Sequence, residues 1–184
     1  MSETMTIAPL STGTWVLDPS HSTVGFVVRH LGFSKVRGSF ASFQGTVDVA
    51  EDVTDSSASI AIDAASFESG DDDRDGHVKS ADFLDVDTYP TLSFEVTDIR
   101  PEGGQRYTVA GELTIRDVTR RVELDTEFLG VDTDPFGNVK AGFEASTEIN
   151  REDFGLTWNA TLESGGLLVG KSVQILLEVQ LNKS

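Results

Sequence analysis

Alternation of apolar and polar residues runs through most of this chain and predicts β-strands. Successive side chains of a strand point to opposite faces, so a period of two indicates one apolar and one polar face. The first such run places Val24, Phe26, Val28 and His30 on one face. The pattern predicts eight strands, at 22–30, 36–49, 58–63, 92–97, 107–115, 121–128, 141–149 and 172–181.

Strands with one apolar face are typical of an antiparallel sheet that is wetted on one side. Closing eight of them into a barrel removes the unpaired edges and leaves an interior that side chains fill or that holds one slender ligand. We therefore expect an all-β fold, an eight-stranded antiparallel lipocalin-like β-barrel. A two-sheet sandwich is the alternative that alternation leaves open. The predicted organisation is a polar, patternless leader at 1–13 and a single domain at 14–184.

Two long segments interrupt the strand pattern. The segment at 70–90, GDDDRDGHVKSADFLDVDTYP, contains the best helix candidate, at about 74–84, and so predicts a short helical insertion between the third and fourth strands. The segment at 151–170 is rich in glycine and small polar residues and separates the last two strands. Connections of this length in a compact domain are usually functional or disordered.

Composition narrows the choice of partners. The formal charge is −17, from 31 acidic and 14 basic residues, so nucleic acid and anionic surfaces are repelled at long range. The chain has no cysteine, which excludes disulfides and thiolate ligands. It shows no basic N-terminal region before an apolar run and no apolar stretch of about 20 residues. We expect a cytoplasmic protein without stable membrane insertion, or a periplasmic or secreted one if the N-terminus is truncated.

The acidic segment also matches a calcium-binding pattern. Asp71, Asp73, Asp75 and Asp82 occupy positions 1, 3, 5 and 12 of an EF-hand-like loop, with glycine at position 6. However, Lys79 stands at position 9 and the flanking residues read as strands rather than helices. We therefore expect no metal and keep calcium as the minority alternative.

The three histidines allow an enzymatic alternative. His21, His30 and His77 are far apart in sequence, but a barrel mouth is a place where they can meet as metal ligands. A serine, histidine and aspartate set for hydrolysis is also available, although no GxSxG motif holds the serine. His30 lies on the predicted inner face, where it is either a hydrogen-bonded core residue or a donor to a bound ligand.

Four motifs in order resemble the YceI-like family of polyisoprenoid-binding proteins. They are DPSHSTVGFVVRHLGFSKVRGSFASFQG at 18–45, RDGHVKSADFLDVDTYPTLSFE at 74–95, VAGELTIRDVTRRVEL at 109–124 and INREDFG at 149–155. The resemblance implies a lipocalin-like barrel whose elongated apolar cavity holds an isoprenoid chain, with the polar head near the mouth. It implies no enzyme activity and no cofactor, and by analogy a homodimer.

These observations together predict a protein that binds, and carries or stores, an isoprenoid lipid such as a polyprenyl phosphate, a polyprenyl pyrophosphate or a quinone. The alternatives are a metal-dependent or hydrolytic enzyme and a ligand-free stress or interaction protein. We expect the apolar cavity wall to comprise Val24, Phe26, Val28, Phe43, Leu92, Phe94, Val96, Val109, Leu113 and Phe143. We expect the headgroup to be bound by His21, His30, Arg74, His77, Lys79 and Arg151.

Overall fold

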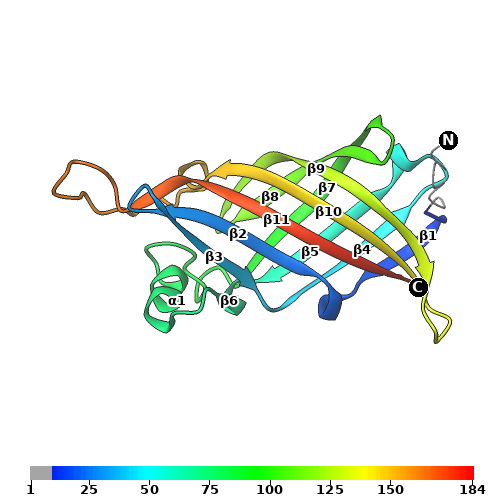
Figure 1. The fold of residues 1–184 in the computed structure, drawn as a ribbon, viewed down its shortest axis with the longest axis horizontal. Coiled ribbons are helices and arrows are strands. Elements are labelled where there is room, and N and C mark those ends of the chain that lie inside the picture. The colour runs from blue at the N-terminus through cyan, green and yellow to red at the C-terminus, as the bar shows by residue number, and fades with distance from the viewer. Residues whose placement is uncertain (1–9) are drawn as a thin grey trace, which may run out of the picture.

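The structure is a computed structural model that describes residues 10–184 and consists mainly of antiparallel β-strands (Figure 1). The strands are β1 (Gly13–Leu17), β2 (Thr23–His30), β3 (Ser34–Phe40), β4 (Phe43–Val49), β5 (Ser57–Asp63), β6 (Phe67–Glu68), β7 (Thr91–Gly103), β8 (Arg106–Ile115), β9 (Val118–Thr133), β10 (Val139–Asn150) and β11 (Val169–Lys183). The helices are α1 (Asp72–Lys79) and the short 3-10 turns η1 (Pro19–His21), η2 (Val53–Asp55), η3 (Ala64–Ser66) and η4 (Arg151–Phe154).

Eight of the strands close into a ring. The hydrogen-bonded order is β1, β4, β5, β7, β8, β9, β10 and β11, and β11 pairs again with β1. The first part of β11 pairs with β2 and its last residues pair with β1, so that Glu178 lies opposite Thr23 and Leu181 opposite Leu17. The predicted eight-stranded antiparallel barrel is confirmed, and the sandwich is excluded by the closure.

Three details of the strand prediction differ from the structure. The predicted strand at 36–49 is two strands, β3 and β4, because its apolar residues change from even positions (Val36, Phe40) to odd positions (Phe43, Val47) at the break. Strands β1 and β6 were not predicted, since five and two residues are too few for a clear period. Residues 1–9 of the predicted leader lie outside the described part, while Leu10 packs against the core and Gly13 opens β1.

The predicted helix at about 74–84 is shorter and begins earlier, at Asp72. Asp71 caps it, because its carboxylate accepts the backbone N–H of Arg74 at 2.9 Å. The helix ends where the backbone N–H and the hydroxyl of Ser80 both donate to the carbonyl of His77. Residues 80–90 then form a series of turns that leads into β7.

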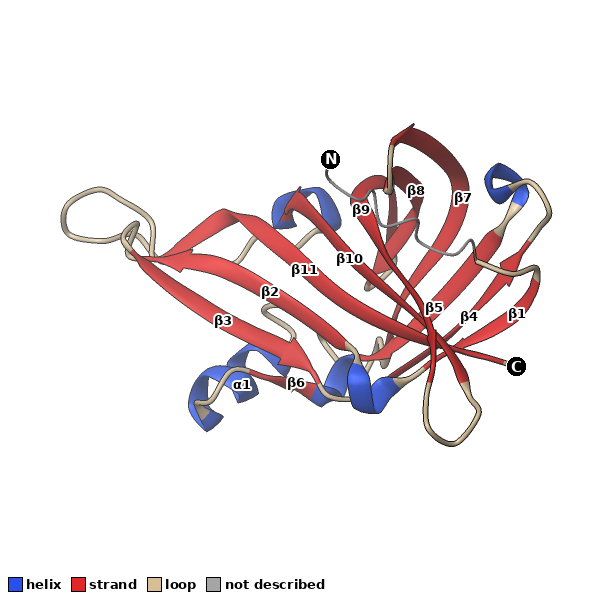
Figure 2. Cartoon of the chain, turned by 45° about the vertical axis from the view of Figure 1, so that its right-hand side comes forward, coloured by secondary structure: helices blue, strands red, loops and turns tan. Residues whose placement is uncertain are grey.

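Helix α1 lies at the end of the barrel where β2 and β3 extend beyond the ring (Figure 1). Here β6 pairs with β3 through only two residues, Phe67 and Glu68, and helices occupy the margins of the sheet rather than its faces (Figure 2). The segment 80–90 is fastened to the β8–β9 turn, because Arg116 donates to the carbonyl of Phe83 and its guanidinium lies over the ring of Tyr89. No helix within residues 10–184 is long and apolar enough to cross a bilayer.

Candidate ligand-binding cavity

Two cavities occupy the barrel interior, one behind the other along its axis. The α1-side chamber, of about 580 Å³, is lined by residues of α1 and by the parts of the strands nearest to it. The far chamber, of about 850 Å³, lies toward the turns that join β4 to β5 and β7 to β8. Four side chains line both chambers, and we call this set the waist: Ile60, Phe94, Leu124 and Leu177. Both volumes fall within the usual range for ligand sites.

The structure distributes the predicted wall residues between the two chambers. The α1-side chamber is lined by Val24, Phe26, Val28, Leu92, Phe94 and Leu113. The far chamber is lined by Phe94, Val96, Val109 and Phe143. Phe43 is buried in the core but lines neither chamber. Alternation along each strand produces this result, since every second residue faces the barrel interior.

The predicted headgroup residues are divided in the same way. His30, Arg74, His77 and Arg151 line the α1-side chamber. Lys79 and His21 line neither chamber. The four residues that meet there come from β2, α1 and η4, so that one end of the barrel gathers side chains from distant parts of the sequence.

Arg151 is the most deeply buried charged side chain of this mouth, with 4% of its surface exposed. Its Nε donates to the carbonyl of Gly170, and its two terminal nitrogens donate to carbonyls of residues 156, 158 and 169 at 2.7, 2.9 and 3.3 Å. Burial lowers the pKa of Arg151, an effect that neighbouring Glu152 opposes. A guanidinium has five N–H donors and four of them make these hydrogen bonds, so one remains for a ligand.

His77 takes part in a small aromatic cluster at the mouth. Its ring packs edge-on against Trp158 and Phe83, with centroids 4.4 and 5.1 Å apart, and its Nε2 lies 2.8 Å from the carboxylate of Asp82. The guanidinium of Arg151 lies 5.7 Å from the centroid of Phe83. This cluster joins α1, the 80–90 segment and the segment after η4, and it forms part of the chamber wall.

His30 and Arg74 differ in how much of their bonding capacity is used. Arg74 donates to both the hydroxyl and the carbonyl of Ser69 at 2.7 Å. The imidazole of His30, at the last position of β2, makes no hydrogen bond to other residues of the described chain 10–184. The imidazole of His30 is therefore available to a ligand in the α1-side chamber, whose wall also includes Arg29 and Asp73.

His21 lies at the other end of β2, in a capping network with Asp18 and Ser20. Hydrogen bonding from the Ser20 hydroxyl outweighs the opposing effect of burial and, with His21 and the Ser20 N–H, holds the pKa of Asp18 far below its ordinary value. The serine oxygen and the aspartate oxygen both face the same ring nitrogen of His21, Nδ1, at 3.1 and 2.8 Å. A catalytic relay needs the two partners on opposite ring nitrogens, so this arrangement is a turn rather than a triad.

The acidic residues of the EF-hand-like pattern do not converge. Asp71 caps α1, and Asp82 contacts His77. Asp75 accepts hydrogen bonds from Ser69; burial alone would raise its pKa, but these bonds, with Lys79 and Arg74 nearby, lower it. Within residues 10–184, no three His, Asp or Glu side chains are placed to hold one metal ion. The helical conformation of 72–79 also replaces the loop that calcium coordination requires.

Several lining residues were not predicted from the sequence. Phe83, Leu156 and Trp158 lie in irregular segments where no period marks an inward face. The sequence signals near them are two of the family motifs: the one at 74–95 contains Phe83, and INREDFG at 149–155 directly precedes Leu156. The waist positions on β5, β9 and β11 lie on alternating strands, but the pattern gives no means of ranking them above their neighbours.

Comparison with known proteins decides the family. Residues 15–181 match the YceI-like domain. The chain belongs to the YceI-like family. A UPF0312 protein of Vibrio cholerae is 35% identical over 139 residues, which cover 74% of this chain and 73% of the Vibrio protein.

Solved structures show the same architecture as this family member. BcnA of Burkholderia cenocepacia has a TM-score of 0.76 and 27% identity, covering 89% of this chain and 98% of BcnA. A polyisoprenoid binding domain from Saccharophagus degradans has a TM-score of 0.72 and 16% identity. The match covers 95% of this chain and 100% of that domain. The second likeness is one of fold.

Proposed function

We propose that this protein binds a long-chain isoprenoid lipid, or a similar amphiphile, along the axis of its barrel. The observation that carries the proposal is the pair of apolar chambers that meet at the waist, with polar side chains gathered at the α1 end. Family membership and the polyisoprenoid binding of the Saccharophagus domain support it. Apolar burial supplies about 25 cal/mol per Å² of ligand surface, less the cost of ordering a flexible chain.

The charges of the two chambers favour one orientation of the ligand. The charged or titratable residues that line the α1-side chamber are one carboxylate, Asp73, and five basic side chains: Arg29, His30, Arg74, His77 and Arg151. The far chamber has Glu51 and Asp52 among its lining residues and, within the described chain, no lysine, arginine or histidine. A phosphate or a quinone oxygen needs N–H donors, so its head lies at the α1 end and its tail extends toward the far chamber.

Binding, followed by carriage or storage, fits this site better than catalysis. The polar residues at the mouth are directed largely at the protein itself: Arg151 at backbone carbonyls, Arg74 at Ser69 and His77 at Asp82. The inward face of the barrel is apolar, which suits a wall that selects a ligand by length and width. A neutral head such as a quinone and an anionic head such as a pyrophosphate both fit the donors available.

Adjacent residues of β11 provide a matched test. Leu177 faces the cavity at the waist, whereas Leu176 faces outward and is 37% exposed. Protein purified without detergent is extracted with organic solvent, and the extract is examined by mass spectrometry. We expect a long-chain isoprenoid with the parent protein and with Leu176→Arg, and its loss with Leu177→Arg, because a guanidinium in an apolar cavity is costly.

Circular dichroism and thermal unfolding of both variants show whether the barrel is intact. Added isoprenoids are tested against the same proteins by fluorescence titration. No lipid in the extract, together with no binding of added isoprenoid by the folded parent protein, contradicts the proposal. Equal binding by a folded Leu177→Arg variant also contradicts it, since the ligand then lies outside the barrel.

A further inference from the structure

Two loop tips at the α1 end of the barrel expose apolar side chains together. Phe33 and Leu31 lie in the β2–β3 turn and are 76% and 36% exposed, and Leu167, in the segment before β11, is 45% exposed. The backbone N–H of Leu31 donates to the carbonyl of Leu168 at 2.9 Å, so the turn and the segment are joined. We call Leu31, Phe33 and Leu167 the apolar tip. Exposed apolar groups that cluster at one place mark interaction sites more often than isolated ones do.

The turn itself is not built for stability. Leu31 has a φ of 57° and Gly32 a φ of 75°, which is the left-handed backbone that Asn-Gly adopts readily in tight hairpins. Leucine in this conformation brings its Cβ close to the following carbonyl and is strained. An apolar residue is thus held in solvent at a position where a small polar residue is more stable.

Cations lie directly behind the apolar tip. Arg29 and Lys35 face each other across β2 and β3, Arg37 follows on the same face, and Lys171 lies on β11. Within residues 10–184, Arg29, Lys35 and Arg37 form no ion pair, while Lys171 lies 3.5 Å from Glu152. Like charges directly opposite each other destabilise a sheet, so an anion bound beside Arg29 and Lys35 would offset their repulsion.

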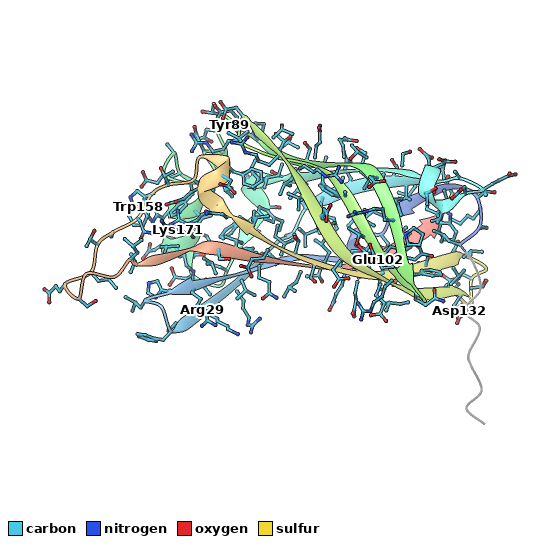
Figure 3. The ribbon with its side chains drawn as sticks, turned by 90° about the horizontal axis from the view of Figure 1, so that it is seen from above. Arg29, Tyr89, Glu102, Asp132, Trp158 and Lys171 are labelled. Carbon is cyan, nitrogen blue, oxygen red and sulfur yellow. The ribbon has the colours of Figure 1, made fainter. Side chains whose placement is uncertain are left out.

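The net charge of −17 does not cancel this local charge. Arg29 and Lys171 lie toward one end of the molecule and Glu102 and Asp132 toward the other (Figure 3). The 15 residues of β11 extend roughly 50 Å, whereas charges are screened beyond about 8 Å at physiological salt. The carboxylates of this end include Glu152, which pairs with Lys171, and Glu163, in the segment before β11, while the acidic helix α1 lies beside β3 (Figure 1).

We propose that the apolar tip and the cations Arg29, Lys35, Arg37 and Lys171 form a reversible docking surface for an anionic lipid bilayer. Phe33, Leu31 and Leu167 enter the headgroup region, and the four cations contact the lipid phosphates. His30 is adjacent to Leu31 and lines the α1-side chamber, so docking brings the mouth of the cavity to the membrane surface.

An exposed phenylalanine at the other end supplies the matched control. Phe136, in the β9–β10 turn, is 88% exposed but lies beside Asp134 and near Asp132. Co-sedimentation is measured with vesicles of phosphatidylcholine alone and with added phosphatidylglycerol, at low and high salt. We expect binding to the anionic vesicles at low salt, a loss of about tenfold for Phe33→Ser and for Lys35→Glu with Arg37→Glu, and no change for Phe136→Ser.

Neutralising the acid of the neighbouring segment, by Glu163→Gln, is expected to strengthen binding to anionic vesicles. Equal binding to neutral and anionic vesicles, or an equal loss for Phe33→Ser and Phe136→Ser, overturns the proposal. A change in sedimentation velocity for Phe33→Ser without any change in vesicle binding also overturns it, because the tip is then a contact between copies of the chain. The vesicles contain no isoprenoid, so a failure of membrane docking is distinguished from a failure of isoprenoid binding.

Discussion

Arg151 shows how a functional prediction at the residue scale changes once its partners are known. Its charge and its place after the seventh predicted strand indicate a headgroup ligand. In the structure the guanidinium binds mainly to the protein itself, because it donates four hydrogen bonds to backbone carbonyls at 156–170. These partners lie in a segment without any period, so the sequence gives no sign of them.

Replacing Arg151 with lysine is expected to destabilise the protein by about 2–4 kcal/mol, because an ammonium cannot reach four carbonyls and leaves buried acceptors without donors. Denaturant unfolding measures the loss, and hydrogen exchange should show faster opening of 155–170. Arg120→Lys is the control: Arg120 is exposed and donates to the carbonyl of Asp153, also in η4, so we expect less than about 0.5 kcal/mol. Similar losses for both variants would show that the buried carbonyls are not the cause.

At the scale of elements, the longer strands and the helical insertion were predictable, whereas the contacts of the connecting segments were not. Alternation can be recognised in the sequence alone, because the residues that form the buried face of a strand all belong to that strand. Seven of the eight predicted runs lie within single strands of the structure, apart from one end residue, Ser22. The inward position of Trp158 depends instead on His77 and Phe83, which are about eighty residues away in sequence. Contacts of this kind leave no local pattern.

The 80–90 segment depends on one such contact. Arg116 adopts a φ of 57° in the β8–β9 turn, donates to the carbonyl of Phe83 and lies over Tyr89. We expect Arg116→Gly to change the free energy of unfolding by less than about 1 kcal/mol, because relief of left-handed strain offsets the lost contacts. Hydrogen exchange in 80–90 should nevertheless accelerate, since this segment loses its attachment.

Leu31→Gly separates the relief of strain from the loss of the attachment, because Leu31 has the same left-handed backbone and its N–H donates to Leu168, outside 80–90. It should stabilise the protein slightly and leave exchange in 80–90 unchanged. If both glycine variants leave 80–90 equally protected, Arg116 does not hold the segment, and its strained backbone needs another explanation.

At the scale of the whole molecule, the barrel is a tube with two different ends and a waist between them. The α1 end has cations, a free imidazole and the apolar tip beside the acidic residues of α1, whereas the far chamber is lined by Glu51 and Asp52 and, within residues 10–184, by no basic side chain. This difference between the two ends follows from which strand ends meet at each end of the ring. The formal charge of −17 describes the whole chain and gives no indication of it. Under the proposed function, the α1 end would bind the head of an isoprenoid and the waist would limit the length of its chain.

Successive inward residues of β11 mark positions along the cavity and so allow the length of a bound chain to be tested. Its inward residues line the α1-side chamber at Ile175, the waist at Leu177 and the far chamber at Val179. If each carbon of a ligand occupies about the volume of one water molecule, ~30 Å³, the α1-side chamber of about 580 Å³ holds about four five-carbon units. A longer chain must pass the waist to remain buried.

We therefore expect Val179→Phe to weaken the binding of long isoprenoids and to leave those of about three units unaffected, because only long chains reach the far chamber. Leu177 lines both chambers, so Leu177→Phe should weaken long chains much more than short ones. Ile175→Phe should weaken all lengths, since every ligand occupies the α1-side chamber. Competition titrations with isoprenoids of graded length against the folded variants measure this. A Leu177→Phe variant that weakens short and long chains equally would show that the waist does not divide the cavity, and the barrel would then hold its ligand as one undivided chamber.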